Sequence, residues 1–296
     1  MKFQLQYASN LFVDLHKRSF DTLLRPSASH LTLLGNIGRP ESPKTYSFLK
    51  FCSSNWKTVL WIPGPHEVSN PNQGHATMSE RATNALALSK QFPNVGFFHG
   101  KERVFFDQRI VLVGAPLWSS LRLPPKGQSE FTRCFTSTDE AGPLPLSLAA
   151  RNALSKQDLQ FLVERKLFWS IVAPQASLVF LTHTLPTPCL LRRPLGDKAW
   201  TRLPMDMMDM RSFMEPPVKA WLGGATGTTH QIQMGTDPAA QVSVGVNGLF
   251  EYPYDGSSNE HYDPEAVLEL GIPRFPMPRL RLPSSLDEPK VSLDLS

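Results

Sequence analysis

The chain has 296 residues, of which 41% are hydrophobic and 19% are charged, so it is long enough to bury a substantial core. Thirty basic and 26 acidic residues leave a net charge of only +4, and no run of basic residues indicates a nucleic-acid-binding tract. Three scattered cysteines form neither a disulfide framework nor a zinc site, and no apolar run is long enough to span a membrane.

The N-terminal residues bear on localisation. Phe3, Leu5 and Tyr7 alternate with polar residues, which predicts a half-buried strand beginning almost at Met1. No apolar signal core and no Arg/Ser-rich presequence stands ahead of this strand. We therefore expect an intracellular protein, cytoplasmic by default, with an organelle such as the mitochondrion left open.

Strands alternate with helices along the chain, which predicts an α/β layered fold. The predicted strands are 2–8, 30–34, 57–62, 94–98, 102–106, 109–114, 177–182, 218–222, 229–234 and 241–246. The predicted helices are 44–54, 78–91 and 155–169. In the last helix, Ser155-Lys156-Gln157-Asp158 resembles a capping box ahead of leucines at helical spacing.

Three segments interrupt this alternation. Residues 119–150 and 185–216 are rich in Pro and form two insertions in a domain predicted to cover residues 1–271. The last residues, 272–296, hold five prolines and three arginines that prevent regular secondary structure. We expect this tail to dock on a neighbouring subunit.

Five short motifs follow predicted strands, at the position where loops converge in a layered α/β fold. They are Asn10-Leu11-Phe12, Gly35-Asn36-Ile37-Gly38, Gly64-Pro65-His66-Glu67, Thr182-His183-Thr184 and Trp221-Leu222-Gly223-Gly224-Ala225-Thr226-Gly227. Their order and spacing over some 220 residues form a specific signal, although each glycine-rich match alone is weak.

In order, spacing and flanking residues the chain resembles the calcineurin-like metallophosphoesterase superfamily, in its prokaryotic-type phosphohydrolase branch. The family pattern is D-x-H, G-D, G-N-H-E, an isolated His and G-H-x-H. The segment Ile110–Trp118 adds to the resemblance, which extends from about residue 2 to about residue 270. It implies a four-layer αββα sandwich with mixed sheets, and a reaction in which two bridged divalent metals activate a hydroxide.

The resemblance also implies that most metal ligands are missing. Both family aspartates are replaced by neutral amides, Asn10 and Asn36. The aspartate at the position of Asn36 bridges the two metals in the family, so this replacement removes the negative charge between them. The other lost ligand positions are Phe12, Pro65, Ala225 and Gly227. His183 alone keeps a metal-ligand residue, and His66 matches the family histidine that donates a proton or steadies the phosphoryl oxygens.

Alternatives to these assignments remain open. A shifted register, Gly227-Thr228-Thr229-His230, would restore one imidazole at His230, although Trp221 and Gly224 favour the first register. His66 is either an anion-binding remnant or part of a turn kept for its shape, and His183 is either a ligand or a hydrogen-bonded strand-end residue. The remaining histidines considered show no ligand spacing and are predicted to be surface or loop residues: His16, His30, His75, His99 and His261.

The leading functional hypothesis is a catalytically inactive homologue, without cofactor or bound metal, that acts as a structural or adaptor subunit. Its predicted partners are other protein subunits of a larger assembly. The net charge of +4 is compatible with an assembly that contains RNA. A second hypothesis is a phosphate- or nucleotide-binding module that uses Asn10, Asn36, His66 and His183. A third is a residual phosphoesterase with Thr226, Thr228 or Ser9 as nucleophile. The sequence identifies no general base that would activate such a nucleophile.

Overall fold

The central strands are apolar on both faces because each lies between two other layers. In β3 (Thr58–Ile62) the side chains of Val59 and Trp61 pack under outer helices, whereas Leu60 and Ile62 point toward a second sheet. The computed structural model describes residues 2–15, 17–68, 78–105, 109–118, 136–139, 142–145, 148–190, 209–224, 229–235, 241–249 and 261–271.

Two mixed sheets form the centre of the protein. The first has the order β13 (Val267–Gly271), β1 (Lys2–Ala8), β2 (His30–Leu34), β3 and β4 (Val95–Phe97). The second has the order β11 (Thr229–Met234), β12 (Val242–Asn247), β10 (Val218–Gly223), β9 (Ser177–Thr182), β6 (Ile110–Ala115) and β5 (Lys101–Phe105). The inner strands run parallel, and β13, β11 and β5 each join antiparallel at an edge.

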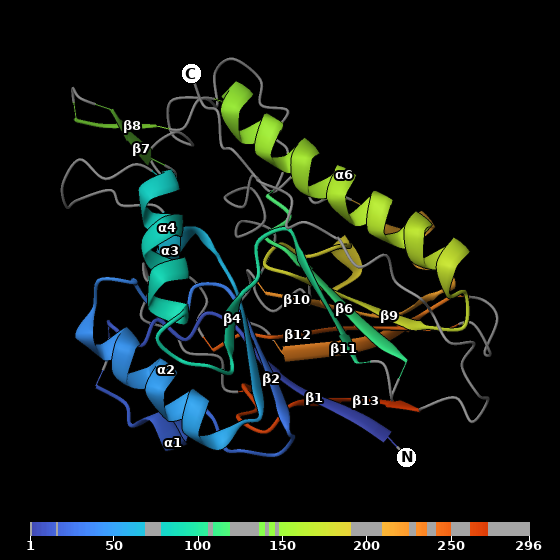
Figure 1. Cartoon of the computed structure of the whole chain (residues 1–296), viewed down its shortest axis with the longest axis horizontal. Coiled ribbons are helices and arrows are strands. Elements are labelled where there is room, and N and C mark those ends of the chain that lie inside the picture. The colour runs from blue at the N-terminus through green and yellow to red at the C-terminus, as the bar shows by residue number, and fades with distance from the viewer. Residues whose placement is uncertain are drawn as a thin grey trace.

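Helices cover the two outer faces. They are α1 (Phe20–Leu23), α2 (Pro43–Asn55), α3 (Pro65–Val68), α4 (Met78–Ser89) and α6 (Leu148–Val172), with short 3-10 turns η3 (Pro188–Leu190) and η5 (Arg211–Phe213). One apolar cluster joins α2 and α4 to the first sheet, a second joins α6 to the second sheet, and a third fills the space between the sheets (Figure 1). This arrangement confirms the predicted four-layer αββα sandwich. None of the described helices combines the length and apolar composition needed to cross a bilayer.

Most predicted elements agree with the structure to within a residue or two, but three differences matter. The sequence pattern did not identify β13, which pairs with β1 at the sheet edge, or the hairpin of β7 (Thr136–Asp139) and β8 (Gly142–Pro145). The helix predicted to start at residue 155 starts at Leu148, so the proposed capping box lies inside α6 and not at its start. The tail 272–296 lies outside the described residues, and its docking stays a prediction.

Asn247, at the end of β12, ties the two sheets together. Its side chain is fully buried and donates to the carbonyl oxygens of Tyr7 (3.0 Å) and Asp263 (2.7 Å). Its backbone carbonyl accepts the N–H of Ser9 at 2.9 Å, directly after β1. Buried amides of this kind must be fully satisfied to be tolerated, and here the satisfaction fixes where β1 ends relative to the second sheet.

Asp158 of α6 has a structural partner in place of the predicted capping role. The carboxylate is buried and accepts the backbone N–H of Trp118 at 3.2 Å, while His99 Nε2 lies 3.8 Å from its other oxygen. Burial raises the pKa of Asp158 to about 7 and lowers the pKa of His99 to about 4. His99 lies in the bend between β4 and β5, a loop position as predicted, and is half-buried. His30, predicted to be a surface or loop residue, is instead the first residue of β2, where it is half-buried and stacks on Phe3 of β1.

We predict that Asp158→Asn changes the pH dependence of stability. Because the pKa of the folded carboxyl lies above its ordinary value of 3.8, its contribution to the free energy of unfolding is complete at low pH and is lost as the pH rises toward 7. The variant does not titrate there, so its stability relative to the wild type should increase by about 2–3 kcal/mol from pH 5 to pH 8. Urea unfolding across this range measures the difference.

Glu164→Gln is the matched control, because it changes an exposed carboxylate on the same helix. Its stability should run parallel to that of the wild type. Parallel curves for Asp158→Asn as well would contradict the assigned protonation state.

Candidate functional site

The motifs predicted to follow strands do come together. Asn10 follows β1, Asn36 follows β2, His66 follows β3 within α3, and His183 follows β9. Because β1, β2 and β3 are parallel in one sheet and β9 is parallel to β10 in the other, these ends meet at one edge of the sandwich. We call Asn10, Asn36, His66, Glu67 and His183 the strand-end cluster.

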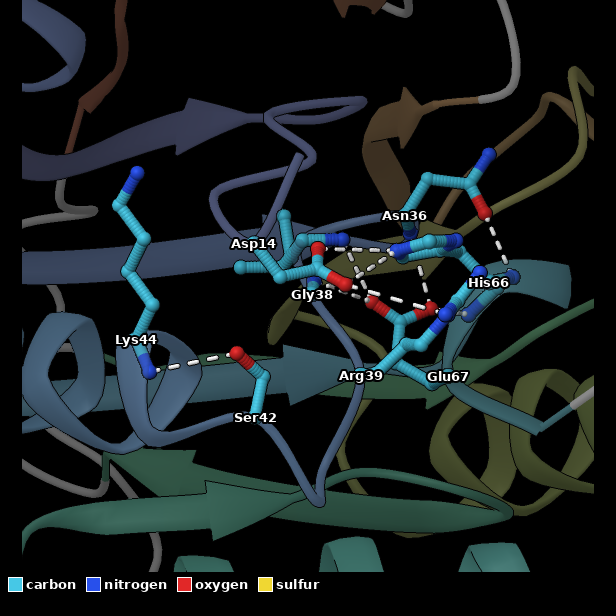
Figure 2. A network of polar contacts seen from close by, with 10 residues as sticks. Asp14, Asn36, Gly38, Arg39, Ser42, Lys44, His66 and Glu67 are labelled. Carbon is cyan, nitrogen blue, oxygen red and sulfur yellow. Dashed lines mark hydrogen bonds and ion pairs between the residues drawn. The ribbon is translucent and has the colours of Figure 1, made fainter. Parts of the chain in front are cut away.

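Glu67 holds together the turns that follow β2 and β3. Its carboxylate is fully buried and accepts four backbone N–H bonds: from Asn36 (2.9 Å), Ile37 (2.5 Å), Gly38 (3.4 Å) and Gly64 (2.7 Å) (Figure 2). Burial raises the pKa of Glu67, whereas the nearby charge of His66 and these N–H bonds oppose that rise. Successive N–H groups aimed at one point form an anion-binding nest, and here the protein's own carboxylate fills it.

Asn10 and Asn36 bind each other. The Asn36 amide nitrogen donates to Asn10 Oδ1 at 3.0 Å, and Asn36 Oδ1 accepts the backbone N–H of His66 at 3.0 Å. Both residues have left-handed backbones, with φ of 54° and 56°, a conformation that asparagine adopts more readily than most residues. The amides therefore keep the tight turns while directing their polar atoms to each other.

Phe12 and Pro65, at two positions that the family resemblance assigns to metal ligands, have packing and backbone roles here. Phe12 also has a positive φ, of 42°, which is strained for an aromatic residue, and its ring meets the His66 ring edge-on at a centroid distance of 5.0 Å. Pro65 begins α3, where a missing N–H costs nothing because the first helical N–H groups have no partner within the helix. Neither side chain can bind a metal ion.

His66 is held by a carboxylate that the motif pattern did not reveal. Its Nε2 lies 2.9 Å and 3.1 Å from the two oxygens of Asp14, and Arg39 Nε lies 3.9 Å from Asp14 Oδ2 (Figure 2). Burial would raise the pKa of Asp14, but the hydrogen bond and charge of His66, together with Arg39, hold it below its usual value. Asp14 is two residues beyond the first motif, so only the three-dimensional structure identifies the pair.

His183 joins the two sheets at this edge. Its Nδ1 donates to the Leu34 carbonyl at 2.8 Å, which leaves Nε2 as an unprotonated acceptor, and its own carbonyl accepts the Gly224 N–H at 2.8 Å. Burial lowers its pKa to about 4, so the ring is neutral at physiological pH. Gly35, Gly64 and Gly224 surround the ring so closely that a Cβ on any of them would lie within 3.2 Å of it.

The remaining candidate residues lie elsewhere or outside the described chain. His230 is on β11, opposite Val246 of β12, and not in the loop after β10 that the shifted register requires. Ser9 is buried and donates its hydroxyl to the Asn247 carbonyl at 3.2 Å. Ala225, Gly227, Thr226 and Thr228 lie outside the described residues.

The donor set does not fit two divalent metal ions. Among the described residues around the cluster, the potential ligands are His183 Nε2 and the oxygens of Asn10 and Asn36, and both amide oxygens already accept hydrogen bonds. Glu67 is occupied by backbone N–H groups and Asp14 by His66. Within the described ranges, no group of three or more His, Cys, Asp or Glu side chains is placed to hold a metal ion.

Comparison with known proteins supports the fold. No family model matches the sequence. An uncharacterized protein of Acanthamoeba polyphaga mimivirus is 20% identical over 216 residues, which are 68% of this chain and 72% of the viral protein. The crystal structure of phosphopantetheinyl hydrolase (PptH) from Mycobacterium tuberculosis has a TM-score of 0.57 at 16% identity, covering 85% of this chain and 90% of the hydrolase. TT1561 of Thermus thermophilus has a TM-score of 0.46 at 16% identity, covering 84% and 90%. The chain thus shares the fold of the phosphopantetheinyl hydrolase, and its chemistry has to be judged from its own residues.

Three glycine-to-alanine changes test how tightly the cluster is packed. Gly35 has φ of 81°, and a Cβ there would lie 2.3 Å from His183 Nδ1. Gly100 has φ of 62° with nothing within 4 Å, and Gly271 has neither constraint. We predict losses in the free energy of unfolding of about 3 kcal/mol or more for Gly35→Ala, about 1 kcal/mol for Gly100→Ala and about 0.5 kcal/mol or less for Gly271→Ala.

Chemical denaturation of the three variants measures these losses. Gly100→Ala isolates the cost of the left-handed backbone, so the excess at Gly35 reports the clash with His183. Equal losses at Gly35 and Gly100 would contradict the close packing of the imidazole.

Proposed function

We propose that the chain is a catalytically inactive metallophosphoesterase homologue that serves as a structural or adaptor subunit of a larger protein or ribonucleoprotein assembly. The observation that carries the first half of this proposal is the amide-to-amide hydrogen bond between Asn10 and Asn36. It lies where, by the family resemblance, two aspartates would bind the metals.

The electrostatics of a binuclear centre explain why this replacement matters. Two divalent ions about 4 Å apart repel each other by roughly 16 kcal/mol at an effective dielectric constant of about 20, and anionic ligands have to offset that repulsion. Asn10 and Asn36 are neutral, and Asn36 directs its amide nitrogen, a donor, at its neighbour. A metal ion would have to break this contact and would gain no negative charge in return.

The alternative of a phosphate-binding remnant receives less support from the same residues. His183 is neutral and presents Nε2 as an acceptor, which repels a phosphate oxygen instead of binding it. His66 already pairs with Asp14, and Asn36 uses both ends of its amide within the cluster. These side chains serve one another, as expected for residues retained for structure.

An adaptor role is supported by the outer face of α6. Val163, Leu167 and Ile171 follow one another at helical spacing and are 40%, 61% and 73% exposed. A stripe of this kind on a surface helix is typical of a face that packs against another apolar helix. We infer that a protein subunit with an apolar helical surface covers it, and that the tail 272–296 is a further contact.

Metal content tests the loss of the catalytic centre. Protein purified without chelators, incubated with manganese and desalted should contain less than about 0.1 metal ion per chain by mass spectrometry, because Asn10 and Asn36 supply no negative charge to offset that of the metal ions. Asn10→Asp with Asn36→Asp should not restore phosphodiesterase turnover, because Phe12 and Pro65 still deny ligands. One or more metal ions in the wild type, or turnover in the double variant, would refute inactivity.

Sedimentation tests the adaptor role. In lysate of the cells that naturally make the protein, the wild-type chain should sediment in a large complex, and Leu167→Glu with Ile171→Glu should move it to the monomer position. Gln160→Glu, on the same exposed helical face, is the control and should leave the complex intact. Gln160, Leu167 and Ile171 are all exposed, so the unfolding temperature of either variant should differ little from that of the wild type.

Ribonuclease treatment separates the two kinds of assembly. Loss of the heavy fraction after digestion assigns a ribonucleoprotein, whereas persistence assigns a protein complex. A wild-type chain that sediments as a monomer in every preparation contradicts the adaptor role without affecting the metal result.

A further inference from the structure

We propose that the loop from Gly38 to Glu41, together with α4, forms a binding site for a phosphoryl group, with Arg81 and Arg39 as its cationic donors. The site is independent of the inactive role proposed above, because it uses none of the residues that would have held metal ions. It begins with Arg81, whose side chain is 6% exposed.

Arg81 is buried without adequate partners. Its Nη1 lies 3.5 Å from Glu41 Oε1, which is a weak contact because the Glu41 side chain is 43% exposed. Among the residues that the structure describes, neither Nε nor Nη1 of Arg81 has a hydrogen-bond partner. A buried guanidinium normally has its N–H groups paired, so an incompletely paired one indicates a missing acceptor.

Arg39, on the loop from Gly38 to Glu41, is also incompletely paired. Its Nε is buried and has no hydrogen-bond partner within the described chain, and its closest carboxylate, Asp14, lies 3.9 Å away and already binds His66. Thr45 Oγ1, which lies against Gly38, is likewise buried and unpaired. Four of the nine such atoms found in the described residues thus belong to Arg39, Thr45 and Arg81, around one loop.

The chemistry of these donors selects the ligand. A guanidinium presents a planar fork of N–H groups that matches two oxygens of a phosphoryl group, and it keeps its charge at every physiological pH. A phosphoryl group has three terminal oxygens and a charge approaching −2, so it can accept hydrogen bonds from more than one such donor. A carboxylate has one oxygen fewer and half that charge.

Glu41 is the group that a ligand would have to displace from Arg81. Its half-exposed carboxylate lies against Arg81 at long range and acts as a weak internal competitor. A phosphoryl group would displace Glu41 into solvent and take its place beside Arg81. Removing the Glu41 charge should therefore strengthen binding, whereas removing the Arg81 charge should abolish it.

Calorimetric titration of the full chain with inorganic phosphate, and separately with AMP, tests the site. We expect saturable binding by the wild type, tighter binding by Glu41→Gln by roughly fivefold or more, and no detectable binding by Arg81→Gln. Tighter binding of AMP than of inorganic phosphate assigns a phosphomonoester ligand, and equal binding assigns the free anion. Both results support the site.

The structure offers a matched control in Arg25 and Glu265. Their charged groups are also 3.5 Å apart, but both side chains are more than half exposed. Glu265→Gln should leave phosphate affinity unchanged, since this pair has no buried unpaired donor.

Three results would overturn the proposal: no saturable binding by either the wild type or Glu41→Gln, no difference between these two proteins, or equal strengthening by Glu265→Gln. Thermal unfolding shows whether Arg81→Gln is folded. If it is not, the comparison of Glu41→Gln with Glu265→Gln decides the question alone.

Discussion

The arrangement of the strand-end cluster depends on one buried carboxylate. Glu67 accepts N–H bonds from three consecutive residues after β2 and from Gly64 after β3, so it holds two strand-end turns in a single geometry. A buried anion is costly unless its lone pairs are satisfied, and here the backbone satisfies them. The same bonds force the chain after β2 into left-handed turns at Gly35 and Asn36. The hydrogen bonds of Glu67 therefore stabilise the fold and fix the geometry of the site at the same time.

That constraint explains why the shape of the site persists in a chain without the metal-binding carboxylates. Phe12 retains a φ of 42°, which disfavours a phenylalanine, because the neighbouring N–H bonds to the Asn36 and Ile37 carbonyls fix the turn around it. His183 persists for a related reason, since its Nδ1 bond to Leu34 joins the sheets and three glycines make room for its ring. An imidazole at a position that the family resemblance assigns to a metal ligand can thus have a structural role of its own.

The strands, the layered fold and the positions of the motifs followed from the sequence because these features are local. Apolar runs such as Val59–Ile62 mark strands buried on both faces, and a motif after such a run lies at a sheet edge. What the sequence did not reveal depends on pairs distant along the chain. Asp14 meets His66 across 52 residues, and Trp118 meets Asp158 across 40, so neither pairing leaves a periodic signal. The start of α6 was placed too late because Ser155 and Asp158 imitate a cap, although Asp158 is buried to bind another segment.

Charge is distributed differently here from the pattern that the family resemblance implies. In a binuclear centre the cations are metal ions and the protein supplies the anions. In this chain Asn10 and Asn36 are neutral, Arg39 lies 3.9 Å from Asp14, which pairs with His66, and Arg81 lies 3.5 Å from Glu41 on the loop after β2. Because guanidiniums are fixed by the chain, they can attract a phosphoryl group but cannot generate the hydroxide that attacks it. The proposed loss of turnover and the proposed phosphoryl site are therefore compatible, since the first rests on the neutral amides Asn10 and Asn36 and the second on arginines at other positions.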